Sequence, residues 1–452
     1  MLCERHSRDD QRREGPSMLT TEENEILTRV GPQTPMGRMM RRFWLPICTS
    51  AQIPEADGDP LRMSLLGESF VVFRDSDGQV GVLEELCMHR GVSLALGRVE
   101  KGGIRCLYHG WKFGADGTIL DTPNHCNARF RERMKAPAFP VREAGGLVWA
   151  YIGPKGRQPE FPHFAFMDGP HEHRAVSRLN TPVNYLQLFE GGVDSSHVGI
   201  LHSNQANPTW MDDEFTARED EDFNPGALAS GDNAPTLDIE DTAFGFHYVA
   251  KRQGPPAADG SPTHSIRVTP AILPVTRIIP APAFQFFVFE VPQSDTVTST
   301  YIIAHGPKPI DRAEIIRIMG LKEPFWNDED CDFRADWANR LGQDRSRMKT
   351  DWTGFDGIEQ EDAVLAMSMG PILDRSREHM VAADRAVIHL RARLLESVRR
   401  HEEGGTPIAH GLDLADVRSL PDTVIAQDDR WQDLVPGNSP AGATAMTEKA
   451  HP

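Results

Sequence analysis

Two loops that each carry one cysteine and one histidine constrain this chain more than any other feature of its sequence. The first contains Cys87-x-His89, and the second, after sixteen intervening residues, contains Cys106-x-x-His109. Thiolates and imidazoles are ligands of zinc and other transition-metal centres. Nearby glycines provide the tight turns that such loops need. They are Gly91, Gly102, Gly103 and Gly110. The segment therefore predicts a metal centre held between two loops.

The distribution of these ligands separates two kinds of metal centre. In a Rieske [2Fe–2S] cluster, two cysteines hold one iron and two histidines hold the other. Structural zinc sites usually pair like ligands, with both cysteines in one loop and both histidines in the other. Here each loop supplies one residue of each kind. We therefore interpret Cys87, His89, Cys106 and His109 as Rieske ligands, with a Cys2His2 zinc site as the alternative.

A second group of ligand-type residues lies in the segment EGGVDSSHVGILHSN, which contains Asp194-x-x-His197-x4-His202. Two imidazoles and one carboxylate form the facial triad of non-haem Fe(II) oxygenases, which leaves positions open for O2 and substrate. Residues five apart on an ideal helix diverge by about 140°. His197 and His202 would therefore converge only on a distorted helix, for example one with a π-bulge. Together with the cluster motif, this spacing predicts a mononuclear iron site.

Composition and charge exclude several classes of protein. Hydrophobic residues make up 39% and charged residues 25% of the 452, as in ordinary globular chains of two or three domains. Six cysteines are too few for a disulfide scaffold. The net charge of −18 argues against nucleic acid or an anionic membrane as a partner. Because we find no secretory signal and no apolar run of roughly 20 residues, we expect the chain in the cytoplasm.

The residue pattern indicates an α+β protein with five segments. They are a disordered tail at 1–17, a helical segment at 18–43, an all-β cluster domain at 44–157, a catalytic domain at 158–403, and a C-terminal tail or arm at 404–452. The runs SFVVFRD, VGVL and GLVWAYIG predict strands of the cluster domain. The runs FGFHYVAKR, FQFFVFEV and TVTSTYIIAH predict an antiparallel sheet in the catalytic domain.

Helices are expected at four places. Thr20 and Glu23 have the spacing of a capping box at the start of the first helix, and a second short helix is expected over Met39–Phe43. Residues 179–202 are expected to be largely helical. An amphipathic stripe predicts a long helix over Arg375–Arg399.

The two motifs resemble those of the Rieske non-haem iron oxygenases that hydroxylate aromatic rings. Tyr108, Gly110 and Trp111 add to the resemblance, and the extra cysteines of respiratory Rieske proteins are absent from both loops. The segments LTRVGPQTPMGRMMRRFWLP and GPILDRSREHMVAADRAVI are similar to the large subunits of the phthalate 4,5-dioxygenase group. The resemblance implies a catalytic domain of helix-grip, START-like architecture.

The resemblance also implies how the second site is completed. The third iron ligand would be Asp362, with Asp356 and Asp374 as competitors. The subunits would form a homotrimer, or a dimer of trimers, in which Asp194 bridges His197 and a neighbouring subunit's His109. Asp194 would then serve electron transfer, because a carboxylate that accepts from a ligating histidine fixes its tautomer.

The activity implied by the resemblance is cis-dihydroxylation of an aromatic carboxylate with O2. O-demethylation of a methoxylated aromatic acid is the alternative, and a pure electron carrier or a zinc-binding scaffold is a weaker one. Electrons would come from NAD(P)H through a flavin and [2Fe–2S] reductase. Because arginine can bind a carboxylate through two parallel hydrogen bonds, four arginines are candidates for substrate binding. A serine beside Asp194 is a further candidate. They are Arg218, Arg252, Arg267, Arg277 and Ser195.

Overall fold

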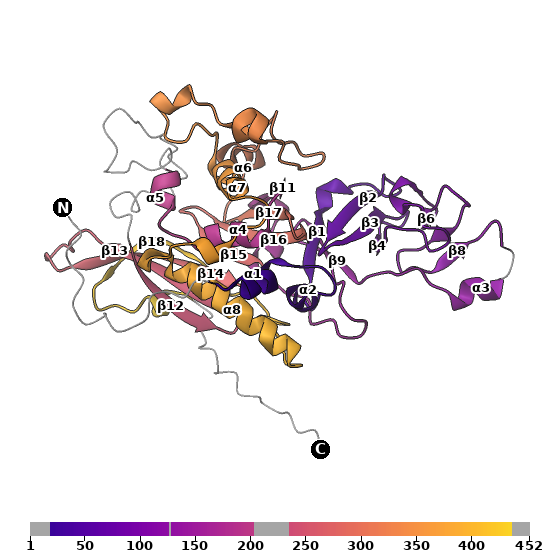
Figure 1. Ribbon diagram of the computed structural model, residues 1–452, viewed down its shortest axis with the longest axis horizontal. Coiled ribbons are helices and arrows are strands. Elements are labelled where there is room, and N and C mark those ends of the chain that lie inside the picture. Colours follow the sequence, from indigo (N-terminus) through magenta and orange to yellow (C-terminus); the bar gives the residue numbers. More distant parts are fainter. Residues whose placement is uncertain (1–18, 126–127, 203–234, 436–452) are drawn as a thin grey trace, which may run out of the picture.

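The chain folds into two β-rich parts that lie end to end, with helices gathered on the larger part (Figure 1). The computed structural model describes residues 19–125, 128–202 and 235–435. The predicted tail at 1–17 lies outside these ranges. The smaller part carries the cysteine–histidine loops and the larger part carries the second group of histidines. The α+β class predicted from the sequence is confirmed.

Two short helices at the start of the described chain pack against the larger part. α1 (Thr21–Thr28) begins at the predicted capping box, in which Thr20 and Glu23 each accept a hydrogen bond from the other's backbone N–H, at 3.1 and 3.0 Å. α2 (Pro35–Met40) begins and ends earlier than the helix predicted over Met39–Phe43. A proline is favoured in the first turn of a helix, where its missing N–H would have no partner.

Three small antiparallel sheets form the cluster domain. In sheet order the strands are β1 (Leu45–Thr49), β10 (Leu147–Ala150) and β9 (Val141–Ala144); β2 (Leu61–Leu65), β3 (Glu68–Arg74) and β4 (Val80–Glu84); and β5 (Arg98–Glu100), β6 (Gly103–Arg105), β7 (Lys112–Phe113) and β8 (Ile119–Asp121). The three predicted runs are confirmed as β3, β4 and β10. Arg98, after the first ligand loop, pairs with Arg105, before the second, so the bases of the two loops lie side by side.

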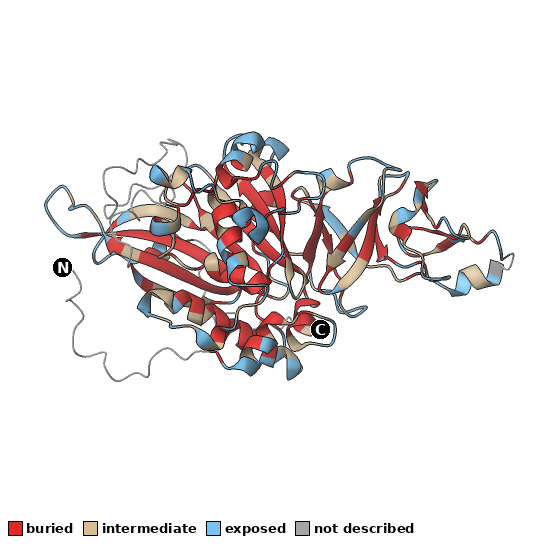
Figure 2. Ribbon diagram, turned by 45° about the horizontal axis from the view of Figure 1, so that its top comes forward, coloured by how far each residue is buried: buried red, intermediate tan, exposed pale blue. Residues whose placement is uncertain are grey.

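The larger part is built on an eight-stranded antiparallel sheet. Its strands, in sheet order, are β11 (Arg174–Thr181), β17 (Val297–His305), β16 (Gln285–Ser294), β15 (Thr276–Pro280), β14 (Thr263–Ile272), β13 (Gly245–Gln253) and β12 (Thr236–Thr242), with β18 (Leu420–Ala426) paired to β14. The three predicted runs are confirmed as β13, β16 and β17. All of these strands except β12 and β18 are buried over most of their length (Figure 2).

Helices lie against this sheet and on one another. The α-helices not yet given are α3 (Ala128–Arg133), α4 (Tyr185–Gly191), α5 (Val198–Leu201), α6 (Arg312–Met319), α7 (Ile358–Ser368) and α8 (Arg385–Glu402). The 3-10 helices are η1 (Ser50–Gln52), η2 (Leu94–Leu96), η3 (Ala165–Met167), η4 (His171–His173), η6 (Trp337–Gly342), η7 (Arg347–Lys349), η8 (Arg375–Arg377), η9 (Ala382–Asp384) and η10 (Trp431–Leu434). Within the described ranges, no helix has the length and apolar character needed to span a membrane.

The sequence prediction was wrong at three places in the larger part. Residues 179–181 end strand β11, and the rest of the segment up to 202 contains only two short helices. The long helix begins at Arg385, not at Arg375; residues 375–377 form the short 3-10 helix η8, and the Arg375 side chain makes a buried ion pair with Glu190. The region from 404 to 435 is no tail, since it folds back and adds β18 to the sheet.

A buried carboxylate connects the helices beneath the second histidine group. Glu190, on α4, accepts from Arg375 Nε at 2.8 Å and from Arg391 Nε at 2.6 Å. Arg375 is fully buried and also donates to the side chain of Asn24 on α1 at 3.1 Å. Burial acts to raise the pKa of Glu190, but the two guanidinium groups outweigh it and lower the pKa. Because α4 leads directly into Asp194, this network fixes where that segment begins.

One buried histidine makes the stability of the fold depend on pH. His247, on β13, is fully buried against the rings of Phe244 and Trp431, and neither of its ring nitrogens has a hydrogen-bond partner in the described part of the chain. Burial lowers its pKa to about 4. The folded state therefore takes up this proton less readily than the unfolded chain does.

We predict that His247→Phe removes part of the acid sensitivity of the fold. The pKa of His247 is depressed on folding, so stability is lost as the pH falls from 6.5 towards 4, by about 3 kcal/mol in total. The melting temperature of the variant, measured by circular dichroism, should exceed that of the wild type at pH 5 by more than at pH 7.5. An equal difference at both pH values would contradict the prediction.

Candidate metal centres and active site

The two cysteine–histidine loops have the same backbone geometry. In the first, Cys87 N–H donates to Val92 and its carbonyl accepts from Gly91, both at 2.8 Å. In the second, Cys106 N–H donates to Trp111 at 2.8 Å and its carbonyl accepts from Gly110 at 3.1 Å. Gly91 and Gly110 have φ values of 70° and 73°, a left-handed conformation that favours glycine. Each loop thus forms a closed turn that presents a cysteine and a histidine together.

The four side chains of these loops converge. Cys87 and Cys106 are both 3% exposed, and the rings of His89 and His109 lie 4.5 Å apart between centroids. Burial, together with the nearby Cys106 thiol, raises the pKa of Cys87 to about 11, so its thiolate requires a bound cation. Nδ1 of His109 is buried and has no hydrogen-bond partner in the described structure. His89 stacks on Trp111, with ring planes 2° apart. This donor set fits a cluster or metal that takes two thiolates and two imidazoles.

The second histidine pair lies on a single helical turn. His197 is the residue before α5 and His202 is the residue after it, where the backbone has already left the helix. The distortion that the spacing requires is confirmed, since His202 has left the helical conformation, but it is the end of a four-residue helix rather than a π-bulge in a long helix. The two rings lie 5.2 Å apart between centroids.

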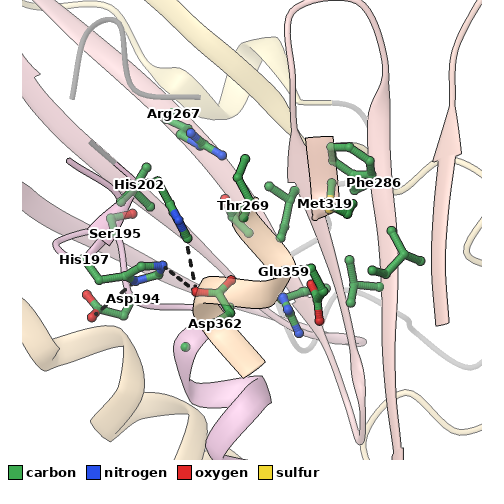
Figure 3. A pocket seen from close by; sticks show the side chains of 18 of the residues that line it. Asp194, Ser195, His197, His202, Arg267, Thr269, Phe286, Met319, Glu359 and Asp362 are labelled. Carbon is green, nitrogen blue, oxygen red and sulfur yellow. Dashed lines mark ion pairs between the residues drawn. The ribbon is translucent and has the colours of Figure 1, made fainter. Parts of the chain in front are cut away.

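Asp362 completes the group. The structure places His197 Nε2 3.7 Å and His202 Nε2 3.4 Å from the same oxygen, Oδ1 of Asp362 on α7 (Figure 3). One ligand atom from each of the three residues lies within 4.8 Å of the others. The competitors are used elsewhere, since Asp356 pairs with Arg347 at 2.7 Å and Asp374 caps a 3-10 helix. The structure therefore brings together the set proposed from the sequence.

A further carboxylate, which sequence reasoning used only as context, orients His202. Glu361 accepts from His202 Nδ1 at 2.7 Å and from the Thr353 hydroxyl at 2.5 Å. Burial acts to lower the pKa of His202, but Asp362 and Glu361 outweigh it and raise the pKa to about 10. The pocket thus has strong affinity for a cation, whether a proton or a metal ion. The two adjacent carboxylates, Glu361 and Asp362, are the sequence signal that could have revealed the orienting role of Glu361.

Asp194 lies on the other side of His197. Its Oδ2 is 3.5 Å from His197 Nδ1, and its Oδ1 accepts from the backbone and hydroxyl of Ser196 at 2.8 and 2.6 Å. Burial acts to raise the pKa of Asp194, but His197 and Ser196 outweigh it and lower the pKa to about 2. The side chain is 24% exposed, so it reaches from His197 to the surface.

A cavity opens on the three converging residues. It holds about 710 Å³ not filled by atoms, part of it open to solvent. Three predicted substrate residues line it: Ser195, Arg267 and Arg277. Arg252 is not among the lining residues, and Arg218 lies outside the described ranges. Sequence reasoning missed the rest of the lining described here. It includes Tyr248, Thr269, Phe286, Met319 and Glu359.

Comparisons with known proteins match both parts of the chain. A family model described as the Rieske [2Fe-2S] domain matches residues 43–139, and one described as LigXa C-terminal domain like matches residues 150–448. The phthalate 4,5-dioxygenase oxygenase subunit of Pseudomonas putida is 38% identical, over 92% of this chain and 94% of that protein. The 5,5'-dehydrodivanillate O-demethylase oxygenase subunit of Sphingobium sp. (strain NBRC 103272 / SYK-6) is 27% identical, over 91% of this chain and 88% of that protein.

A solved structure shares the fold. Dicamba monooxygenase bound to dicamba superposes with a TM-score of 0.54 at 16% identity, covering 80% of this chain and 98% of that one. The chain therefore belongs to the Rieske non-haem iron oxygenases and is the oxygenase component of such a system. Its relatives place it in the phthalate 4,5-dioxygenase group, as the sequence resemblance predicts. Family membership implies a [2Fe–2S] cluster and an iron, and the donor sets described above fit both groups.

We predict that Glu361→Gln weakens binding of Fe(II) by about 10- to 100-fold, because the amide holds His202 Nδ1–H less strongly than the carboxylate does. Anaerobic competition with a coloured chelator measures the dissociation constant. Glu329→Gln, an exposed change of the same kind, serves as the control and should have no effect. Equal iron affinity in the Glu361 variant and the wild type would exclude this orienting role.

Proposed function

We propose that this oxygenase component uses O2 and reductase-supplied electrons to cis-dihydroxylate an aromatic carboxylate of the phthalate type. The observation that carries the proposal is a cavity that ends at His197, His202 and Asp362 and also contains Arg267 and Arg277. O-demethylation of a methoxylated aromatic acid is the second candidate, since one relative is named for that reaction.

We assign the cluster to Cys87, His89, Cys106 and His109, and the mononuclear iron to the three residues that converge in the cavity. When bound, the cluster supplies electrons one at a time and the ferrous ion supplies the oxygen-activating centre. Glu361 holds His202 in one tautomer by accepting from its Nδ1. Asp194 lies 3.5 Å from His197 Nδ1 and would orient the other histidine in the same way.

The lining of the cavity fits an aromatic acid. Phe286, Val288 and Ile302 provide an apolar wall against which a ring can pack. Arg267 lines the cavity and donates to the carbonyl of Pro280 at 3.2 Å, and its guanidinium group would also bind the substrate carboxylate. Ser195 lines the cavity and its hydroxyl lies 3.4 Å from that of Tyr248, so these two hydroxyl groups would be available to a substituent of the ring.

We further propose a head-to-tail homotrimer, or a dimer of trimers. In Figure 1 the cluster domain and α5 lie towards opposite ends of the molecule, so in this proposal the cluster of one subunit serves the iron of its neighbour. Leu86, Leu107 and Tyr108, beside the cluster ligands, are 55%, 59% and 53% exposed. Ile200 and Leu365, beside the iron ligands, are each 40% exposed. These two apolar surfaces are suited to meet in a heterologous interface that closes into a ring.

In this assembly, Asp194 links the two metal centres. It would accept from His197 within its own subunit and from the neighbouring subunit's His109. Electrons would reach the cluster from NAD(P)H through a separate reductase that carries flavin and a [2Fe–2S] centre. We place the enzyme in the cytoplasm, where NAD(P)H is available.

A turnover screen tests the reaction. The purified protein, loaded with cluster and Fe(II) and supplied with a reductase, should convert phthalates, halobenzoates or methoxybenzoates, with products identified by mass. Incorporation of both atoms of 18O2 into the ring supports dihydroxylation, whereas a product lighter by one CH2 supports demethylation. If no acid is converted while the cluster still accepts electrons, the proposed oxygenase reaction is wrong and the result supports an electron carrier. Zinc in place of iron would identify a scaffold.

We predict that Asp194→Asn slows electron transfer from cluster to iron by at least about tenfold, because the amide cannot accept from two imidazoles as the carboxylate does. Stopped-flow absorption of the cluster measures its reoxidation in a single turnover with substrate and O2. Iron content should stay unchanged, which distinguishes this role from direct ligation.

Asp374→Asn is the matched control, since this aspartate only caps a 3-10 helix. An unchanged reoxidation rate in the Asp194 variant would show that electrons take another route.

A further inference from the structure

One acidic side chain of the cavity has no function in the scheme above. Glu359, on α7, lines the cavity and is 5% exposed, yet no hydrogen bond joins its carboxyl group to any other described residue. It precedes Asp362 by three residues, so the two share a face of the helix. Figure 3 shows it on the other side of Asp362 from the two histidines. A buried polar group without a partner is costly, so its retention requires a reason.

The charges around Glu359 leave it without a cation of its own. Arg277, on β15, is 3% exposed and donates to Glu290 Oε1 at 2.5 Å. Glu290 is fully buried and also accepts from the Thr300 hydroxyl at 2.6 Å. Asp362 belongs to the metal-binding group. The guanidinium group of Arg277 is thus paired with Glu290, and one further carboxylate, that of Asp362, lies on the same face of α7 as Glu359.

A carboxyl group in such surroundings keeps its proton. Burial, followed by the negative charges of Glu290 and Asp362, raises the pKa of Glu359, and the opposing effects of Arg277 and His202 are smaller. A protonated carboxyl offers one O–H donor. In the described structure this donor can be satisfied only from the cavity, because none of the surrounding side chains accepts from it.

Gly192 keeps this arrangement in place. A Cβ atom there would lie 1.8 Å from Nε of Arg277, so only glycine lets the arginine pass this point and reach Glu290. The position of Arg277, and hence the charge balance at Glu359, is built into the end of α4.

We propose that Glu359 is a specificity-determining residue that donates a hydrogen bond to a second oxygen substituent on the aromatic ring, such as a second carboxylate or a methoxy group. Arg267 lies at a different part of the cavity wall (Figure 3) and would bind the first carboxylate. The two anchors would then select acids with two oxygen functions over simple benzoates. This inference rests on the proposed function, since it takes an aromatic acid as the substrate.

The test compares two variants against three ligands. Glu359→Gln keeps a donor of similar size, and Glu359→Leu removes it. Dissociation constants for benzoate, phthalate and 3-methoxybenzoate are measured by anaerobic calorimetry on the full protein loaded with cluster and Fe(II). Glu359→Leu should weaken binding of phthalate and 3-methoxybenzoate by about tenfold or more, while benzoate changes less than about twofold. Glu359→Gln should bind all three within about threefold of the wild type. Glu314→Leu, an exposed change on α6, is the control.

The remaining outcomes contradict either the role of Glu359 or the proposed substrate class. If Glu359→Leu weakens the binding of all three ligands equally, or of none of them, Glu359 does not bind a second substituent and the inference is overturned. The same follows if Glu359→Gln behaves like Glu359→Leu, because the negative charge rather than the donor would then matter. If the wild type binds none of the three acids, the proposed substrate class is wrong, and the role of Glu359 falls with it. Circular dichroism shows whether each variant is folded.

Discussion

The carboxylate of Glu190 holds the catalytic part of the molecule together. Arg375 and Arg391 both donate to it, from segments about two hundred residues away in sequence. A buried carboxylate with two guanidinium partners is tolerable only as a complete set, since removing one partner leaves an uncompensated charge. The network joins α1, α4 and α8 at the point where α4 turns towards Asp194. The geometry of the histidines is therefore set by an ion cluster that does not itself line the cavity.

Acidic groups dominate the site. Asp194 lies against one histidine, Glu361 against the other, and Asp362 between them, while Glu359 occupies the next position along the cavity. Such a density of carboxylates in a buried region is stable only with cations. The histidine protons serve this purpose when no metal is bound, and a ferrous ion would do so in the active enzyme. The same acidity makes Arg267 necessary if an anionic substrate is to enter, because Arg277 is paired with Glu290.

The sequence predicted the ligand residues because their chemistry is local. The cluster ligands are recognisable from spacing alone, and Asp194, His197 and His202 lie within nine residues of one another. The strands rich in aromatic and β-branched residues, β13, β16 and β17, were predicted for the same reason. Strand β11 was not predicted, and residues 179–181 at its end were assigned to the helical segment although Pro182 follows them directly.

What the sequence could not predict depends on contacts between distant segments. The long helix α8 was predicted to begin too early, and Arg375, which was expected in its first turn, makes an ion pair with Glu190, far away in sequence. The charges that act on Glu359 come in part from Glu290 and Arg277 on the sheet, and no sequence pattern along α7 reveals these two residues. The roles of such residues follow from tertiary charge balance, which local propensity does not encode.

Strand β18 has a consequence for the way the protein is made. It pairs with β14 along Thr263–Val268, which includes Arg267 of the cavity wall, although it follows that strand by about 150 residues. During synthesis, this edge of β14 has no partner until the last described strand has left the ribosome. The substrate-binding wall is thus finished late, and until then β14 exposes an open edge to other chains. The interval between the synthesis of β14 and the synthesis of β18 sets how long a nascent subunit depends on protection from aggregation.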